Sequence, residues 1–468
     1  MHRKAILLLL AWLAAAVDGT AAGSSVTIDV SQRFQTIAGF GVNFNGTYFR
    51  DAQKPMIDML IDDLGATIFR LDPYGIINWE TQNDNDDPGV MNWEYYNDRY
   101  SIPTFEASWA SARYLNSRGI RPFLTLSGRP PDWMLDTKLP PLPGRKPSTG
   151  PDHLNPGMYE EFAETLVSML VYARTKARID FEYFSPLNET DCPPNEGPRI
   201  DPEEMPKVLE SIARRMKKEG LGDVKLVVCD QCRLGNDYFG PILQNEELMK
   251  QVAVFSLHSY GQQPITPHVD RVRNSKSPQL PLWLTEYGDL NDLDKSQDNE
   301  WKNFSLAATK RALRALNEGA SVALFWDAYD NYHEHYPRLT FYGLVQNTDH
   351  IYAPKKRYFA AKQLYHFVRP GSQRIALNSD AAGLLLSAFR NAADGTLTVV
   401  GVKEGGPTEF DLVLAGTGAR VRAWDVYLTT RDVDCRKVDT VAVKDGGAKI
   451  SLPPDAIFTL VATVKESD

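Results

Sequence analysis

Eight short runs rich in β-branched and aromatic residues recur along most of the chain. They lie at residues 36–44, 66–74, 121–127, 180–186, 224–230, 252–260, 280–288 and 321–329. Near-continuous hydrophobic runs of this length are typical of parallel strands that are buried on both faces of a sheet. The pattern therefore predicts a parallel sheet with eight strands.

Segments with a helical spacing of hydrophobic residues lie between these runs, at 54–64, 105–117, 157–176, 202–218 and 297–317. Asp201-Pro202 predicts the start of the fourth helix, because Asp is a favoured N-cap and Pro a favoured first helical residue. The alternation of strand and helix predicts an α/β fold, a (β/α)8 TIM barrel. An open doubly wound sheet is the alternative, but the Gly-rich phosphate loop expected after its first strand is missing from the sequence.

The pattern changes from about residue 374 to short runs separated by Gly, Asp and Asn turns. This pattern predicts a C-terminal antiparallel β-sandwich side domain. Residues 26–34 are also strand-like, and we expect them to pair with that domain. The predicted organisation is a signal peptide at 1–22, a strand joining the side β-domain at 23–35, a (β/α)8 barrel at 36–368 and a β-sandwich at 369–468.

The N-terminus has the features of an export signal. Basic residues precede an apolar run from Ala5 to Val17, and small residues follow up to Ala22. This order predicts a cleavable signal peptide and a secreted or periplasmic protein. We expect no membrane span, because no later stretch is long and apolar enough. The net charge of −9 argues against nucleic acid or an anionic membrane surface as partner.

Four cysteines in an oxidising compartment predict at least one disulfide. Cys192 follows the fourth predicted strand, while Cys229 and Cys232 follow the fifth. Ends of neighbouring strands lie close together, so we expect Cys192 to pair with Cys232 or Cys229, which leaves Cys435 unpaired. A zinc half-site at Cys229 and Cys232 would need a second ligand pair at similar spacing, and the sequence offers none.

A second possible metal motif, His333 and His335 with His350 nearby, is more typical of a polar loop than of a metal site. We therefore predict no metal and no cofactor.

Polar and aromatic residues stand at the ends of the eight predicted strands. In a barrel these ends converge on one mouth, where catalytic groups are placed. The residues at these ends are Asn43, Arg70, Ser127, Asn188, Glu189, Asp230, His258, Tyr260, Glu286, Trp326 and Asp327. Glu189 and Glu286 follow the fourth and seventh strands, so they face each other across the mouth.

Two opposed carboxylates, one protonated and one ionised, are the requirement of a retaining glycosidase. Arg70 and Tyr260 are predicted to keep Glu286 ionised, as the nucleophile. Burial beside Glu286 favours the protonated form of Glu189, as the acid/base. His258 is expected at the same site because of its strand-end position.

Two tryptophans are predicted to bind substrate. Trp326 follows the eighth strand and Trp133 lies in the loop after the third. Apolar rings that face a sugar stack against its C–H face, and ordinary core packing is the alternative for both.

Several motifs resemble the clan A glycoside hydrolases, most closely glycoside hydrolase family 30. The motifs are Gln35-Thr-Ile-Ala-Gly-Phe-Gly, Pro130-Pro-Asp-Trp-Met, Pro186-Leu-Asn-Glu, Leu257-His-Ser-Tyr, Trp283-Leu-Thr-Glu-Tyr-Gly and the segment 358–371. The resemblance covers nearly all of the chain after residue 22. It implies that Asn188 hydrogen-bonds the sugar 2-hydroxyl. The chain departs from the family at Thr190, where Pro is usual, and in the loop that contains Trp133.

The predicted function is retaining hydrolysis of a β-linked glycan. The resemblance implies hemicellulose-type substrates such as xylan, β-glucan or β-galactan, and the sequence does not choose among them. Two alternatives remain: a catalytically inactive carbohydrate-binding protein on a glycosidase scaffold, and an inverting hydrolase, which needs a wider carboxylate spacing. The sequence determines neither the choice between endo and exo action nor the oligomeric state.

Overall fold

The computed structural model describes residues 24–74, 79–139, 151–192, 196–332, 338–349, 351–415 and 419–466. The predicted signal peptide at 1–22 and the histidines at 333, 335 and 350 lie outside the described residues. No helix within the described part of the chain is long and apolar enough to cross a membrane.

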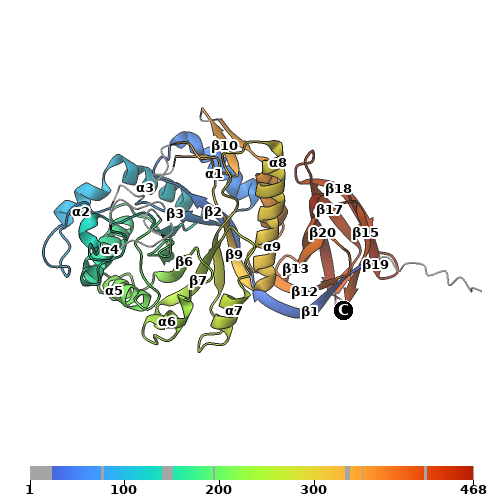
Figure 1. Ribbon diagram of the computed structural model, residues 1–468. Coiled ribbons are helices and arrows are strands. Elements are labelled where there is room, and N and C mark those ends of the chain that lie inside the picture. The colour runs from blue at the N-terminus through green and yellow to red at the C-terminus, as the bar shows by residue number, and fades with distance from the viewer. Residues whose placement is uncertain are drawn as a thin grey trace, which may run out of the picture.

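Eight parallel strands close into a barrel, as predicted (Figure 1). In order around the barrel they are β2 (Gly39–Phe44), β3 (Ile68–Leu71), β4 (Phe123–Thr125), β5 (Tyr183–Ser185), β6 (Lys225–Gln231), β7 (Val252–Ser259), β8 (Leu282–Tyr287) and β9 (Ala320–Phe325). Each of the eight hydrophobic runs overlaps one barrel strand. The sequential order and parallel pairing confirm a TIM barrel rather than an open doubly wound sheet.

A small hydrophobic cluster occupies the N-terminal part of the barrel strands. It contains Val227, Val254 and Trp283, which precede the polar residues Asp230, His258 and Glu286 on the same three strands. Parallel strands all point the same way, so these apolar layers lie beneath the polar residues. The barrel is therefore a packed core with a polar end.

Helices surround the barrel near the predicted positions. They include α1 (Lys54–Asp58) with the π-helix Met59–Leu64, α3 (Pro103–Ser117), α4 (Tyr159–Thr175), α5 (Met205–Lys218), and α8 (Gln297–Asn299) continued by the π-helix Glu300–Ala307 and α9 (Ala308–Glu318). Shorter helices α6 (Phe239–Leu243) and α7 (Thr266–Arg273) cover β6 and β7. One hydrophobic core joins the helices to the barrel strands.

Two local predictions were wrong. Helix α5 begins at Met205 and not at Pro202, because the backbone carbonyl of Asp201 accepts hydrogen bonds from the N–H groups of Glu204 and Met205 in a turn before the helix. The Asp201 carboxylate pairs with Arg199 at 3.1 Å instead of capping the helix. The predicted helices include none between Pro73 and Pro103, but this segment contains α2 (Trp93–Tyr100), whose N-cap Asn92 accepts a hydrogen bond from the N–H of Tyr95.

The remaining strands form a separate β-rich unit beside the barrel (Figure 1). They are β1 (Ser25–Thr36), β12 (Gln373–Ser379), β13 (Leu384–Asn391), β14 (Thr396–Lys403), β15 (Thr408–Ala415), β16 (Ala419–Val421), β17 (Ala423–Thr429), β18 (Arg436–Ala442), β19 (Gly447–Leu452) and β20 (Ala456–Glu466). Hydrogen bonding runs β18-β17-β20-β14-β13-β12-β1-β15-β19, with β16 paired to β20. Strands β1 and β15 pair in parallel, and the other pairs described in this sheet are antiparallel.

The sheet encloses its own core and is attached to the barrel through helix α10 (Lys356–Tyr365). The end strands β18 and β19 contact each other, and the core between the two halves includes Ile28, Trp424 and Leu460. On the barrel side, Gln363 of α10 donates a 2.9 Å hydrogen bond to Thr429 of β17. A hairpin of β10 (Val345–Thr348) and β11 (Ile351–Pro354) precedes α10.

Candidate active site

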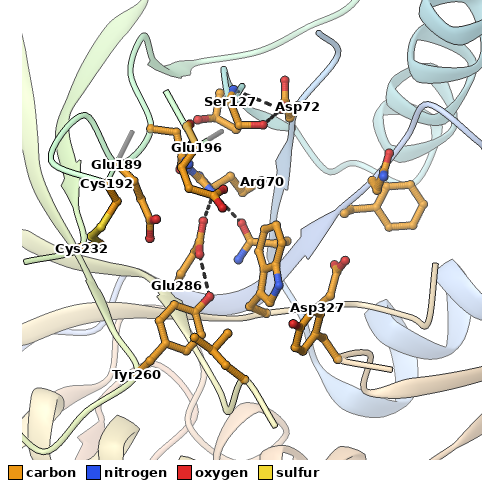
Figure 2. A pocket seen from close by; sticks show the side chains of 18 residues that line it. Arg70, Asp72, Ser127, Glu189, Cys192, Glu196, Cys232, Tyr260, Glu286 and Asp327 are labelled. Carbon is orange, nitrogen blue, oxygen red and sulfur yellow. Dashed lines mark hydrogen bonds and ion pairs between the residues drawn. A yellow bond between two sulfur atoms is a disulfide. The ribbon is translucent and has the colours of Figure 1, made fainter. Parts of the chain in front are cut away.

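A cavity of about 320 Å³ opens at the C-terminal ends of the barrel strands. Figure 2 shows side chains from several different strands converging on it. Of the eight residues predicted to be catalytic or to bind substrate, six line it: Arg70, Asn188, Glu189, Tyr260, Glu286 and Trp326. The strand-end prediction thus brings these side chains together, as expected for parallel strands in a closed barrel.

Arg70 is the centre of a buried hydrogen-bond network. Its Nη1 donates to Asn43 at 2.8 Å and to Oε1 of Glu286 at 2.7 Å. Its Nη2 donates to Asn188 at 2.7 Å and to Asp230 at 3.0 Å. The Arg70 side chain is 3% exposed, and a planar guanidinium with several donors can serve these four separate acceptors at once. Arg70 therefore fixes Glu286 and Asn188 relative to each other.

Asp230 lies beneath the two glutamates at the end of β6. Its carboxylate is fully buried and accepts hydrogen bonds from Thr285 at 2.6 Å and Ser185 at 2.7 Å, besides the bond from Arg70. Its backbone carbonyl accepts from the N–H of Glu189 at 2.9 Å. Asp230 thus holds both Arg70 and the backbone of Glu189 in place.

His258 lies under the glutamate pair and is 1% exposed. Its Nδ1 lies 2.7 Å from Oε1 of Glu189 and 3.4 Å from Oε2 of Glu286. One carboxylate oxygen of each glutamate lies within 4.8 Å of the other. Tyr260 donates a 2.6 Å hydrogen bond to Oε2 of Glu286. Both oxygens of Glu286 therefore have a donor, one from Arg70 and one from Tyr260.

The pKa values at the site reflect burial. Burial raises the pKa of Glu286 above its ordinary value, although His258, Arg70 and the Tyr260 hydroxyl act in the opposite direction. For Asp230, Arg70 and the hydrogen-bond donors outweigh burial and lower the pKa. Burial lowers the pKa of His258 despite the neighbouring carboxylates, which favours a neutral imidazole. The raised pKa of Glu286 differs from the expectation that Arg70 and Tyr260 dominate, because the effect of burial is larger than theirs.

Two predicted site residues are not part of the cavity lining: His258, which contacts the two glutamates from below, and Trp133, which lies apart from them. Trp133 is half-buried in the short 3-10 helix Asp132–Met134 and packs against the core, and its indole N–H donates to the carbonyl of Glu80 at 3.3 Å. Trp326, in contrast, lines the cavity next to Asp327.

Several site residues carried no assigned role in the sequence analysis. Asn43 and Asp230 were visible only as polar residues at strand ends, and their part in binding Arg70 needs the closed barrel. Asp72 lines the cavity and accepts a hydrogen bond from the N–H of Ser127 at 3.1 Å. Glu196 also lines it, and its backbone carbonyl accepts from Asn188 at 3.1 Å. The signal that could have found Asp72 is its place just after the second strand.

Cys192 and Cys232 form a disulfide, which confirms the predicted bridge and selects Cys232 over Cys229. Both cysteines line the cavity. The N–H of Cys192 donates to the carbonyl of Glu189 at 2.7 Å, so the bridge fixes the turn that carries Glu189. Cys229 and Cys435 form no disulfide with the described residues.

Glu189, His258 and Glu286 have donor atoms close enough together to hold a cation. Arg70 and Tyr260 already bind both oxygens of Glu286, and the positive guanidinium would repel a metal at that position. The arrangement is thus better suited to two carboxylates that act on a bound molecule directly.

No protein-family model matches the sequence. The fold of the chain, a TIM barrel with a β-rich side unit, is nevertheless shared with solved glycoside hydrolase structures. Solved structures with this fold include a glycoside hydrolase family 30 subfamily 8 xylanase, Xyn30A, from Clostridium acetobutylicum, with a TM-score of 0.71 and 18% identity over 94% of this chain and 99% of that one.

Two further structures of similar fold are the catalytic domain of a GH30 xylanase C and an endo-β1,6-glucanase. The xylanase, from Talaromyces cellulolyticus, has a TM-score of 0.71 and 19% identity over 94% of this chain and all of that one. The endo-β1,6-glucanase BT3312 has a TM-score of 0.66 and 18% identity over 94% of each chain. The fold is therefore the one that the resemblance to family 30 predicted.

Proposed function

We propose that this protein is a glycoside hydrolase that cleaves a β-linked glycan with net retention, using Glu286 as nucleophile and Glu189 as acid/base. The observation that carries the proposal is the pair of glutamates at opposite strand ends, with carboxylate oxygens within 4.8 Å of each other. Retaining enzymes place the two carboxyl groups about 5–5.5 Å apart, whereas inverting enzymes need about 6.5–9.5 Å to fit a water.

The two glutamates differ in surroundings in the way the mechanism requires. Glu286 receives donors from Arg70 and Tyr260, which stabilise its ionised form. Glu189 is the more exposed of the two, with 13% of its side chain exposed against 6% for Glu286. Its Oε1 faces Nδ1 of the neutral His258. This contrast supports an acid/base role for Glu189, which must exchange its proton with leaving group and water.

In the first step an oxygen of Glu286 forms a bond to the anomeric carbon, and the bond from that carbon to the leaving oxygen breaks. Glu189 gives its proton to the leaving oxygen. In the second step Glu189 takes a proton from water, whose oxygen displaces Glu286 from the anomeric carbon. Asn188 lines the same cavity and is proposed to bind the sugar 2-hydroxyl, and Trp326 to stack on a sugar face.

The proposed substrates are neutral hemicellulose-type glycans such as xylan, β-glucan or β-galactan. The solved structures of similar fold include xylanases and an endo-β1,6-glucanase. Three further acidic residues, Asp72, Glu196 and Asp327, line the cavity, and acidic side chains there favour an uncharged substrate over an anionic one. We also retain the proposal of export through residues 1–22, which N-terminal sequencing of the secreted chain would test.

The test is reducing-sugar release from a panel of β-glycans and aryl β-glycosides, with NMR of the first-formed anomer. Glu286→Gln is expected to lower kcat by at least about a thousandfold. Glu189→Gln should hydrolyse an aryl glycoside with an acidic leaving group far better than one with a poor leaving group, because only the latter needs the proton. Release of the inverted anomer, or a Glu286→Gln variant as active as wild type, would overturn the proposal.

A second candidate function is a carbohydrate-binding protein without activity, since a fold does not fix a function. Binding of a glycan by the wild type without cleavage of any panel member would favour it. The intact Arg70–Glu286–Tyr260 contacts argue against this alternative, because a binding protein does not need an oriented nucleophile.

A further inference from the structure

A second group of acidic residues lies outside the active site, on the flank of the barrel that carries α2, α4 and α5 (Figure 1). It consists of Asp84, Glu161 and Glu164, and is called the Asp84 cluster below. One carboxylate oxygen from each residue lies within 4.8 Å of the others. Glu161 and Glu164 are three residues apart on α4 and therefore share one face of that helix. Asp84 belongs to the segment between β3 and α2.

The cluster contains buried oxygens that lack a partner. Glu164 is fully buried, and its Oε2 has no hydrogen-bond partner among the described residues. Oδ1 of Asp84 likewise has no hydrogen-bond partner among the described residues. A buried oxygen left without a partner destabilises the fold, and more so when it is charged. Three carboxylates at this spacing also repel one another, so a positive ligand would remove both costs.

The cations already present do not balance the cluster. Arg215 of α5 donates to Oε1 of Glu164 at 3.2 Å, but its Nε also donates to Glu219 at 3.0 Å. Glu161 accepts a hydrogen bond from the neutral side chain of Asn83 at 3.5 Å. Oδ2 of Asp84 accepts from the N–H of Asn92 at 2.7 Å and from Asn85 at 3.0 Å. Three carboxyl groups thus face one guanidinium that is shared with a fourth carboxylate.

We propose that the Asp84 cluster binds one calcium ion. Calcium takes oxygen ligands at about 2.3–2.6 Å, and three carboxylate oxygens within 4.8 Å of one another lie close enough together to share one ion. Its members offer only carboxylate oxygens, which disfavours zinc and copper. Magnesium demands a stricter octahedron and retains more water, which fits a partly buried set of carboxylates poorly.

The ion would fasten the segment after β3 to helix α4. This segment contributes Glu80, whose carboxylate accepts from the N–H of Asp84 at 2.9 Å and whose carbonyl accepts from Trp133. It follows directly on Asp72, which lines the catalytic cavity. The proposed role is structural, and it does not depend on the proposed hydrolase activity.

The experiment uses the full chain after treatment with a chelator and desalting. We expect about 5 mM CaCl2 to raise the Tm by about 2–5 °C, with a smaller effect of MgCl2, and one calcium per chain to remain in equilibrium dialysis. Terbium luminescence sensitised by nearby aromatic rings, and its displacement by calcium, should report binding to the wild type directly. The Glu161→Gln/Glu164→Gln double variant is expected to lose the Tm shift and to bind terbium at least tenfold more weakly.

Glu160→Gln is the matched control, because Glu160 lies on the same helix but pairs with Ser211 and Arg214. It should keep the full calcium effect. The proposal is overturned if the wild type binds neither calcium nor terbium, if the double variant keeps the Tm shift, or if MgCl2 stabilises as much as CaCl2. Stabilisation of the wild type by acid alone, without any calcium effect, would show that a proton satisfies the cluster, and would equally overturn it.

Discussion

Nδ1 of His258 lies 2.7 Å from Oε1 of Glu189, at the base of the cavity. The other ring nitrogen, Nε2, lies 3.9 Å from Oδ1 of the buried Asp230. A neutral imidazole with its proton on Nε2 directs that proton toward Asp230 and offers the Nδ1 lone pair to Glu189. In this tautomer His258 accepts a hydrogen bond from protonated Glu189 and stabilises the form that donates a proton to the leaving group.

This relationship predicts the effect of His258→Phe on the pH profile. Without His258, protonated Glu189 loses a hydrogen-bond acceptor, which favours its ionised form. The alkaline limb of kcat/KM should therefore move to lower pH. The measurement is kcat/KM against pH on an aryl β-glycoside. The opposite tautomer, with the proton on Nδ1, donates to ionised Glu189, and its loss would move the alkaline limb to higher pH. A shift in that direction would contradict the assignment.

A second prediction concerns Tyr260, which donates to Glu286 at 2.6 Å. The hydroxyl lowers the pKa of Glu286, against the larger effect of burial, which raises it. Tyr260→Phe should therefore raise this pKa further and move the acid limb of kcat/KM upward by about 0.5–1 unit. Loss of a hydrogen bond to a charged group should also lower kcat/KM about 10- to 100-fold.

The control for Tyr260→Phe is Tyr427→Phe, which removes a hydroxyl from the side sheet. Its acid limb and kcat/KM should match those of the wild type. An acid limb that stays in place in Tyr260→Phe would mean that Glu286 does not titrate in that limb.

A third prediction concerns the buried ion pair of Arg70 with Asp230, at 3.0 Å. Asp230→Asn removes one of the two carboxylates that balance a guanidinium with 3% exposure. Removing one partner of a buried pair costs about 3–5 kcal/mol, so the free energy of unfolding in urea should fall by that amount. Asp223→Asn breaks the exposed pair with Arg174 at 2.7 Å and should cost less than about 1 kcal/mol. Equal losses in the two variants would contradict the role of Asp230.

The fold could be predicted from the sequence because barrel strands bury both faces. Residues 280–288, for example, are apolar up to the turn, so both the strand and the position of Glu286 at its end follow from the pattern. The same reasoning placed Arg70 and Glu189 at the mouth. These predictions depend only on hydrophobic spacing and on the common direction of parallel strands.

Other features needed the three-dimensional structure. Asp230 was visible as a polar strand end, but nothing in the sequence shows that it contacts Arg70, a residue 160 positions earlier. Trp133 was chosen for its ring and its loop, yet a short helical turn packs it against the core. The start of α5 was misplaced because a local Asp-Pro signal is the same for a turn and for a helix. Tertiary contacts determine the partner of Asp230, the packing of Trp133 and the residue at which α5 begins.

The last prediction concerns the disulfide between Cys192 and Cys232, which joins the chain after β5 to the end of β6. The bridge closes a loop with a sequence separation of 40 residues, and a loop of that length predicts a contribution of about 2–4 kcal/mol to the free energy of unfolding. The turn that begins at Glu189 is held at one end by the N–H of Cys192. Reduction should therefore lower both the stability and kcat, since a loosened turn misplaces the acid/base.

The measurement is urea unfolding and kcat of the wild type with and without a phosphine reductant. The Cys192→Ser/Cys232→Ser variant should behave like the reduced wild type and should not respond to reductant. Cys435→Ser is the control, because Cys435 lies in the side sheet away from the bridge, and it should respond like the wild type. If the wild type loses stability but keeps its kcat, the bridge stabilises the fold without positioning Glu189. If neither quantity changes on complete reduction, confirmed by thiol titration, the bridge has no part in either.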